Sequence, residues 1–325
     1  MYRQKASRKK VFLLILLFLS LWLIFASFTP KKQYRVTKEP VPKAKNIIFM
    51  APDGMGLACV TAARIFKNGP NGQGLHMETL SAIGYQRTHS ANSATTDSAA
   101  AASAWASGEK VRNGEISCHD DNRDGKCEPT PAPTILELAR ERGKSAGLVV
   151  TSTVTDATPA AFGAHVPRRG CENEIARQYI QVTGVEVILG GGAAKFNAPK
   201  ANVDDCGTFG DFIAAARTRG YGVVYTKDAM EEAVSRGTKK LLGLFARNEK
   251  SPELFRVFPA EHYRVDEPTL PQMTAAALEI LEKDQDGFFL LVEGSQIDWA
   301  GHDNNLPYQI SETLAFDEAV KVVLD

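Results

Sequence analysis

The sequence predicts an α/β fold with a doubly wound, mostly parallel sheet flanked by helices. Short apolar runs alternate with helical stretches from residue 46 onwards, and this alternation is typical of βαβ units. Hydrophobic residues make up 44% of the chain and charged residues 23%, a globular composition that excludes disordered and fibrous proteins. A length of 325 residues is enough for one large domain or two smaller ones.

The expected elements follow one another along the chain. Apolar runs bounded by Gly, Pro or polar residues predict strands at NIIFM (46–50), SAGLVVTS (145–152), VEVILGGG (185–192), GVVYT (222–226) and FFLLVEG (288–294). Helices are predicted at 57–67, 98–107, 134–143, 211–220, 273–284 and 310–325. Ligands of doubly wound sheets bind beyond the carboxyl ends of the strands, so polar residues after each strand are the candidate site.

The N-terminus is basic and then strongly apolar. The run VFLLILLFLSLWLIFASF (11–28) follows five basic residues and no acidic residue. Its position and charge match an export signal, whereas its length is close to the roughly 20 residues that span a bilayer. Residues 1–28 are therefore expected to be a signal peptide or a membrane anchor, and 29–45 a linker to a folded domain at 46–325. We expect an exported protein, periplasmic or extracellular.

The charge of the chain argues against a nucleic-acid partner. The formal net charge is zero, but residues 29–325 carry 33 basic and 38 acidic side chains. A nucleic-acid-binding domain usually has a basic surplus, which this domain lacks.

Five cysteines fit an oxidising compartment. Cys118 with Cys127, and Cys171 with Cys206, are near in sequence and could close surface loops. Cys59 is left over and is expected to be a small, buried hydrophobic residue.

The run DDNRDGKCE (120–128) resembles the start of a calcium loop through Asp120, Asn122 and Asp124. The twelfth position of such a loop normally carries Glu, but here it falls on Pro131. We therefore interpret the run as a polar turn closed by its flanking cysteines.

Residues with metal-binding chemistry follow three of the predicted strands. Asp53 follows the first strand, Asp156 and Thr158 follow the second, and Glu293 lies near the end of the last. Carboxylates gathered in this way repel one another unless cations are bound. Glu293 and Asp53 taken alone also fit a helix cap or a turn, so the coincidence of these residues at strand ends is what predicts a site.

Two further features fit metal and phosphate chemistry. Asp298 and His302 are four residues apart and would face one way on a helical turn, which suits zinc but also suits an ordinary surface pair. Arg169 offers a planar cationic fork that can bind phosphate through two hydrogen bonds. Its alternative is a solvated surface arginine beside Arg168.

The stretch TTDSAAAASAWASG (95–108) predicts a short helix that begins at Asp97 and Ser98. Ala favours the helix interior, Asp and Ser its start, and Gly108 its end. Free N–H groups and the positive end of the helix dipole favour an anion there and a serine that loses its proton. Ser98 is thus a candidate nucleophile, with a plain helix cap as the alternative.

Five segments resemble, in order, the signatures of the alkaline phosphatase family. They span residues 46 to about 305 and read NIIFMAPDGMG, TTDSAAAASAWASG, TDATPAAFGAHVPRR, VILGGG and VEGSQIDWAGHDN. The resemblance implies hydrolysis of phosphate monoesters with two Zn²⁺ ions and one Mg²⁺ ion, through a serine that is transiently phosphorylated. Dimers are common in that family, so a homodimer is an open alternative for this chain.

The resemblance also implies a role for each candidate residue. Ser98 resembles the nucleophile, which also contacts a metal, and Asp97 lies beside it. Asp53 resembles the carboxylate shared between magnesium and one zinc. The other roles implied are those of the magnesium ligands Asp156, Thr158 and Glu293, the zinc ligands Asp298 and His302, and the phosphate-binding Arg169.

The resemblance is incomplete at the zinc sites. An Asp-His pair on a later strand and one further His of the family have no counterpart among the six histidines of this sequence. A catalytic zinc site with three protein ligands cannot be assembled from the rest. We hypothesise that the sequence is the N-terminal part of a longer phosphatase, and we expect the 325 residues alone to be weakly active or inactive.

Two other functions stay open at this stage. A phosphodiesterase of the same superfamily would use a threonine nucleophile, for which Thr95 and Thr96 are the candidates. A relative that has lost catalysis would bind metal or phosphate at the membrane without forming phosphoserine.

Overall fold

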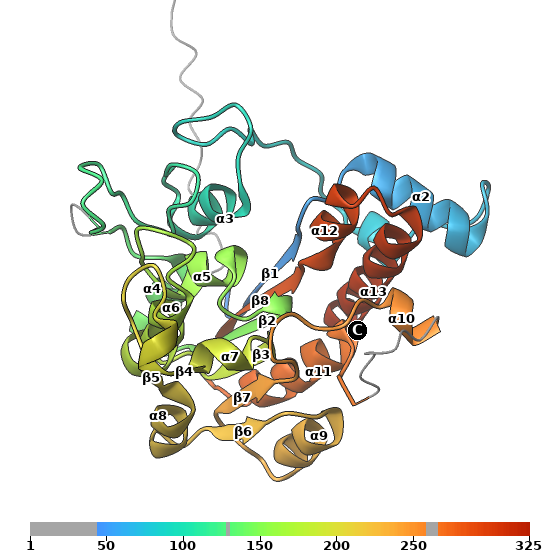
Figure 1. Cartoon of the computed structure of the whole chain (residues 1–325). Coiled ribbons are helices and arrows are strands. Elements are labelled where there is room, and N and C mark those ends of the chain that lie inside the picture. The colour runs from blue at the N-terminus through green and yellow to red at the C-terminus, as the bar shows by residue number, and fades with distance from the viewer. Residues whose placement is uncertain (1–43, 128–130, 258–265) are drawn as a thin grey trace, which may run out of the picture. The chain divides into compact units, whose positions relative to one another are not determined.

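A six-stranded sheet forms the centre of the computed structural model, which describes residues 44–127, 131–257 and 266–325 (Figure 1). The strand order is β1-β8-β2-β3-β7-β6, and every pair of neighbours is parallel. These strands are β1 (Ile47–Pro52), β2 (Ser145–Thr153), β3 (Val187–Gly191), β6 (Gly222–Val224), β7 (Leu241–Leu244) and β8 (Phe288–Gly294). A separate antiparallel pair joins β4 (Asn197–Ala198) and β5 (Gly210–Asp211). The predicted α/β fold is confirmed.

Helices connect the strands. The α-helices of the described residues are α2 (Leu57–Asn68), α3 (Ser98–Ser107), α4 (Ile135–Glu141), α5 (Ala157–Gly163), α6 (Glu172–Gln178), α7 (Ala193–Phe196), α8 (Phe212–Thr218), α9 (Lys227–Ser235), α10 (Leu254–Val257), α11 (Leu270–Leu281), α12 (Gln296–His302) and α13 (Leu306–Leu324). Shorter turns are η1 (His76–Thr79), η2 (Tyr179–Thr183) and η3 (Lys200–Asn202). Local sequence explains several starts: α4 and α11 both begin with a capping box, from Thr134 and Thr269.

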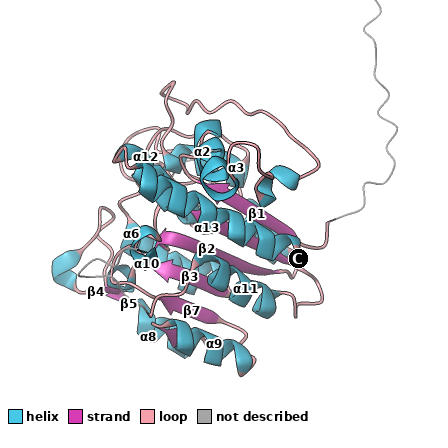
Figure 2. Cartoon of the chain, turned by 90° about the vertical axis from the view of Figure 1, so that its right-hand side faces the viewer, coloured by secondary structure: helices cyan, strands magenta, loops and turns pink. Residues whose placement is uncertain are grey.

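The helices cover both faces of the sheet, and Figure 2 shows α11 and α13 crossing in front of it. Along β2, Leu148 and Val150 point into the core layer that holds α3, α4 and α5, whereas Val149 points into the layer that holds α9, α11 and α13. Alternate residues of a strand face opposite sides. Because both faces are buried, the central strands are continuous apolar runs instead of alternating ones.

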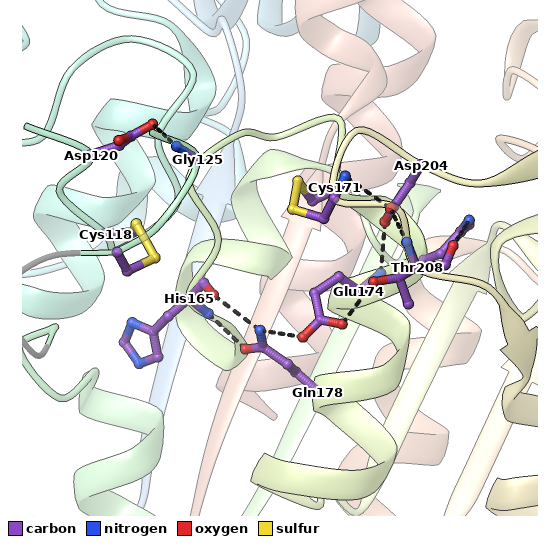
Figure 3. The surroundings of a disulfide bond; sticks show 12 residues. Cys118, Asp120, Gly125, His165, Cys171, Glu174, Gln178, Asp204 and Thr208 are labelled. Carbon is purple, nitrogen blue, oxygen red and sulfur yellow. Dashed lines mark hydrogen bonds between the residues drawn. A yellow bond between two sulfur atoms is a disulfide. The ribbon is translucent and has the colours of Figure 1, made fainter. Parts of the chain in front are cut away.

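Disulfides link the two cysteine pairs that the sequence suggested. Cys118 bonds to Cys127 and Cys171 bonds to Cys206, while Cys59 is free and buried in α2. Near Cys171, the Asp204 carboxylate accepts hydrogen bonds from the backbone N–H groups of Glu174, Cys206 and Thr208. Figure 3 shows Asp204 between Glu174 and Thr208. Two disulfides are consistent with an exported protein.

The predicted signal peptide or anchor (1–28) lies outside the described residues, as does the predicted linker (29–45) except for its last two positions. In the described parts of the chain, no helix combines the length and the apolar composition needed to cross a bilayer.

The buried carboxyl group of Glu312 in α13 generates a prediction about stability. Glu312 is 2% exposed, and its Oε1 accepts a hydrogen bond from the Glu253 backbone N–H at 2.6 Å. Burial, reinforced by the charge of Glu253, raises the Glu312 pKa from 4.5 to about 8. The folded state therefore holds a proton that the unfolded state has released, so the free energy of unfolding falls as pH rises from 4.5 to about 8.

We expect Glu312→Gln, which keeps the hydrogen-bond acceptor and carries no charge, to remove this part of the pH dependence. At pH 9 the variant should be more stable than the wild type by a few kcal/mol, and near pH 4.5 the two should differ little. Urea unfolding between these pH values measures the difference. Glu279→Gln, at an exposed position of α11, is the control and should follow the wild type at every pH. Parallel curves for Glu312→Gln and wild type would show that Glu312 does not hold the proton.

Candidate active site at the carboxyl edge of the sheet

The polar residues that follow the strands meet in one cleft of about 930 Å³. Helix α5 follows β2 and helix α12 follows β8 along the chain. Figure 1 shows both helices, together with α3, near one end of these strands. Six of the predicted site residues line this cleft, namely Asp53, Ser98, Asp156, Arg169, Asp298 and His302. Thr158 and Glu293 do not line it, because they are 3% and 2% exposed. Parallel strands explain the meeting, since their carboxyl ends lie at the same edge.

Ser98 occupies the first turn of α3, with its hydroxyl directed at Asp53. Its Oγ donates a hydrogen bond to Asp53 Oδ2 at 2.9 Å. The helix cap is Asp97, whose Oδ1 accepts from the Ala100 N–H at 2.9 Å, so the interpretation of Ser98 as the cap itself is wrong. Because Asp97 fulfils the capping role, the Ser98 hydroxyl is left to face the cleft.

A glycine lets the loop after β1 approach α12 closely. Gly54 has φ +67°, a conformation that favours glycine, and a Cβ atom built on it would lie 2.6 Å from the Asp298 backbone Cα. Asp53 is next to this contact. The close approach thus brings the carboxylates of Asp53 and Asp298 to the same part of the cleft.

Arg169 is tied to two carboxylates and is not a plain surface arginine. Its Nη2 lies 3.0 Å from Asp156 Oδ1, and its Nη1 lies 3.5 Å from Asp97 Oδ2. Burial alone would lower the Arg169 pKa, but these two acidic partners raise it. The guanidinium side chain is still 39% exposed, which leaves part of its fork open to an anion in the cleft.

Two carboxylates of the site, Asp53 and Glu293, are destabilised in their charged forms. Burial, followed by the negative charge of Asp298, raises the pKa of Asp53 to about 6, although the hydrogen bond from Ser98 acts in the opposite direction. Burial and the charge of Asp53 also raise the pKa of Glu293 well above its ordinary value. Glu293 Oε2 is buried and has no hydrogen-bond partner among the described residues. A divalent cation is the group that would relieve both effects.

The donor set fits cations in chemistry, although its carboxylates do not enclose one point. Within the described part of the chain, no three His, Cys, Asp or Glu side chains come close enough to hold a metal ion by themselves. Asp298 and His302 do approach each other, with Oδ2 and Nε2 3.4 Å apart. The His302 side chain is 78% exposed, so this pair lies at the rim of the cleft.

Asn113 and Gly114 hold the site in place, and the sequence analysis missed both. The Gly114 N–H donates to Asp97 Oδ2 at 2.9 Å, and its carbonyl accepts from the Arg169 N–H at 2.7 Å. The Asn113 side chain accepts from the Asp97 N–H at 3.2 Å and donates to the Thr95 carbonyl at 3.0 Å. The Asn-Gly dipeptide was available as a turn signal, but a turn signal does not reveal which residues the turn supports.

Known proteins resemble this chain over most of its length. The family model described as "Alkaline phosphatase" matches residues 44–325. Alkaline phosphatase 3 of Bacillus subtilis is 36% identical over 290 residues, which cover 86% of this chain and 57% of the relative. The Repressible alkaline phosphatase of Saccharomyces cerevisiae is 38% identical over 306 residues, which cover 87% of this chain and 52% of the relative. This chain therefore spans little more than half the length of these two relatives.

Solved structures of alkaline phosphatases have a similar fold. The alkaline phosphatase of Thermus thermophilus superposes with a TM-score of 0.74 at 35% identity, over 86% of this chain and 56% of that one. A mutant of the alkaline phosphatase from the Antarctic bacterium TAB5, described with Mg bound in its M3 site, superposes with a TM-score of 0.71 at 30% identity, over 86% of this chain and 72% of that one. On the family match and these relatives, the chain belongs to the alkaline phosphatase family.

Proposed function

We propose that the protein hydrolyses phosphate monoesters through a phosphoserine intermediate on Ser98. The observation that carries this proposal is the Ser98 hydroxyl, which sits in the first turn of α3 and donates to Asp53 Oδ2 at 2.9 Å. The relatives support the same reaction class, because those named above are alkaline phosphatases. The bound phosphate would lie in the cleft between Ser98 and Arg169.

Residues of this chain supply the positioning for such a reaction. The Asp53 carboxylate orients the Ser98 oxygen, and the free N–H groups at the start of α3 face the negative charge of the phosphate. The Arg169 fork binds non-bridging phosphate oxygens through charge-assisted hydrogen bonds. A bond forms from Ser98 Oγ to phosphorus as the alcohol oxygen of the ester leaves with a proton. Water then cleaves the phosphoserine and releases inorganic phosphate.

The same residues would hold the cations that the family implies. We assign Mg²⁺ to Asp53, Asp156, Thr158 and Glu293, and Zn²⁺ to Ser98 with Asp53 and to Asp298 with His302. Bound divalent cations lower the pKa of a coordinated hydroxyl and stabilise charge on attacking and leaving oxygens. The unpartnered oxygen of Glu293 and the raised pKa of Asp53 support this assignment.

The alternative of a threonine nucleophile is not favoured. Thr96 Oγ1 donates a hydrogen bond to the Asp97 carbonyl at 2.9 Å, so this hydroxyl is directed at the backbone. Ser98 Oγ is instead directed at a carboxylate of the cleft. A phosphodiesterase that uses Thr96 would need a different arrangement of this hydroxyl.

Ser98→Ala tests the nucleophile. In the protein as its source organism makes it, we expect the rate of p-nitrophenyl phosphate hydrolysis to fall by about 10³-fold or more, because the bond-forming oxygen is gone. Acid quenching with labelled phosphate should trap phosphoserine in the wild type and not in the variant. Ser107→Ala, at the other end of α3, is the matched control and should keep the activity. Activity that survives in Ser98→Ala would reject Ser98 as the nucleophile. A wild-type enzyme that hydrolyses the substrate but yields no labelled phosphoserine on acid quenching would reject the covalent intermediate.

Arg169→Ala tests the phosphate contact. We expect a fall in kcat/KM of about 10- to 100-fold and weaker inhibition by inorganic phosphate, because charge-assisted hydrogen bonds to the phosphate oxygens are lost. The neighbouring Arg168→Ala is the control, because Arg168 does not line the cleft that contains Ser98. Equal effects of the two substitutions would mean that general positive charge, and not the Arg169 fork, attracts the substrate.

Glu293→Gln tests the cation assignment without an activity assay. In the presence of a chelator at alkaline pH, the variant should have a higher Tm than the wild type, because its amide cannot acquire the buried negative charge whose cost raises the Glu293 pKa. Added Mg²⁺ should then raise the Tm of the wild type more than that of the variant, because the variant lacks a ligand. The exposed Glu282→Gln is the control. Identical responses to Mg²⁺ in all three proteins would remove Glu293 from the proposed ligand set.

A further inference from the structure

The loop closed by the Cys118–Cys127 disulfide lies outside the reaction proposed above. It contains the spacing Asp120-x-Asn122-x-Asp124-Gly125, which the sequence analysis interpreted as a polar turn. In calcium loops, positions one, three and five supply side-chain oxygens, position six is a glycine at a sharp turn, and position seven supplies a backbone carbonyl.

Asp120, at position one, is buried without full hydrogen bonding. The residue is only 7% exposed. One carboxylate oxygen, Oδ2, accepts a hydrogen bond from the Gly125 N–H at 3.2 Å, which directs the carboxylate across the loop (Figure 3). The other oxygen, Oδ1, is buried and has no hydrogen-bond partner among the described residues. An unpaired buried carboxylate oxygen is costly, and a cation beside it would remove that cost.

Gly125 and Asp124 also adopt the conformation that a calcium loop needs. Gly125, at position six, has φ +83°, which permits the sharp reversal there. Asp124 Oδ1, at position five, accepts from the Lys126 N–H at 3.0 Å, so this carboxylate is folded back onto the loop. The backbone carbonyl of Lys126 occupies position seven. Glu128, at position nine of the sequence pattern, lies outside the described residues.

The surroundings of the loop set an upper limit on its affinity. Asp120 shares a cavity of about 420 Å³ with four arginines, Arg112, Arg123, Arg168 and Arg169. The Arg168 Nη2 lies 3.8 Å from the position of a Cβ atom built on Gly125. These positive charges oppose a cation, yet none of them forms an ion pair with Asp120 among the described contacts. Pro131 at position twelve also removes the bidentate glutamate of tight sites.

We propose that this loop binds one Ca²⁺ ion through the side-chain oxygens of Asp120, Asn122 and Asp124 and the carbonyl of Lys126. Only two of these donors are carboxylates, which agrees with the absence of any described cluster of three His, Cys, Asp or Glu side chains around one point. Calcium is favoured over magnesium because a flexible set of mixed oxygen donors suits its larger, irregular coordination shell. The affinity belongs to the weak class of extracellular sites, with a Kd of about 10⁻⁴ to 10⁻³ M.

Equilibrium dialysis of the intact, oxidised protein against radioactive Ca²⁺ tests this site. Saturating Mg²⁺ and Zn²⁺ are kept on both sides of the membrane, so that the carboxylates of the active-site cleft are not available to calcium. We expect one Ca²⁺ per chain in the wild type, and a Kd raised at least about tenfold in Asp120→Asn and in Asp124→Asn. Asp121→Asn, which changes an exposed carboxylate of the same loop at a position that supplies no ligand, is the matched control and should bind as the wild type does.

A second measurement on the same proteins uses the disulfide as a reporter. Calcium should slow the reduction of the Cys118–Cys127 bond by a thiol in the wild type and in Asp121→Asn, and not in Asp124→Asn. Asp124 makes only local contacts at the surface, a hydrogen bond from the Lys126 N–H and an ion pair between its Oδ2 and Lys126 Nζ at 3.5 Å, so its variant decides the question if Asp120→Asn fails to fold. Absence of saturable Ca²⁺ binding in the wild type, or unchanged binding in Asp124→Asn, would overturn the proposal.

Discussion

The parallel pairing of β1, β8 and β2 is the constraint on which the site depends. The register sets Ala51 of β1 and Val150 of β2 opposite Glu293 of β8, so β1 and β8 end at the same level and β2 ends at the same edge, about two residues further on. Asp53 follows β1 by one residue and Asp156 follows β2 by a short turn. A shift of one residue in either pairing would turn the Glu293 side chain to the opposite layer and separate these carboxylates.

This convergence has a cost in the folded protein that the surrounding residues only partly offset. Glu293 is buried near the end of β8, which lies between β1 and β2. Asp53 has the negative charges of Asp298 and Asp156 near it. Ser98 and Arg169 supply hydrogen bonds and positive charge, but one oxygen of Glu293 still has no described partner. A fold optimised for stability alone would not gather like charges at one edge of the sheet, so their presence argues for a ligand that carries positive charge.

The sequence predicted those parts of the fold and site that depend on local pattern. Long apolar runs such as FFLLVEG mark strands whose burial comes from both faces of the sheet, and polar residues at their ends mark the cleft. The four-residue strand β7 (Leu241–Leu244) was not predicted, because LLGL becomes a strand only by pairing with β3 and β6, which are distant in sequence. Gly114 was missed for a similar reason: it acts through its backbone N–H and carbonyl, which every residue type has.

The position of Arg169 shows how covalent and hydrogen-bonded links combine around the cleft. On its N-terminal side, Val166 exchanges two backbone hydrogen bonds with Ile116, and the Arg169 N–H itself donates to Gly114. On its C-terminal side, Cys171 is bonded to Cys206. The guanidinium group therefore projects from a segment that is fixed at both ends, and little backbone freedom remains to be lost when an anion binds. Because one of these ties is a disulfide, the Cys171–Cys206 bond contributes to the geometry of the site as well as to the stability of the fold.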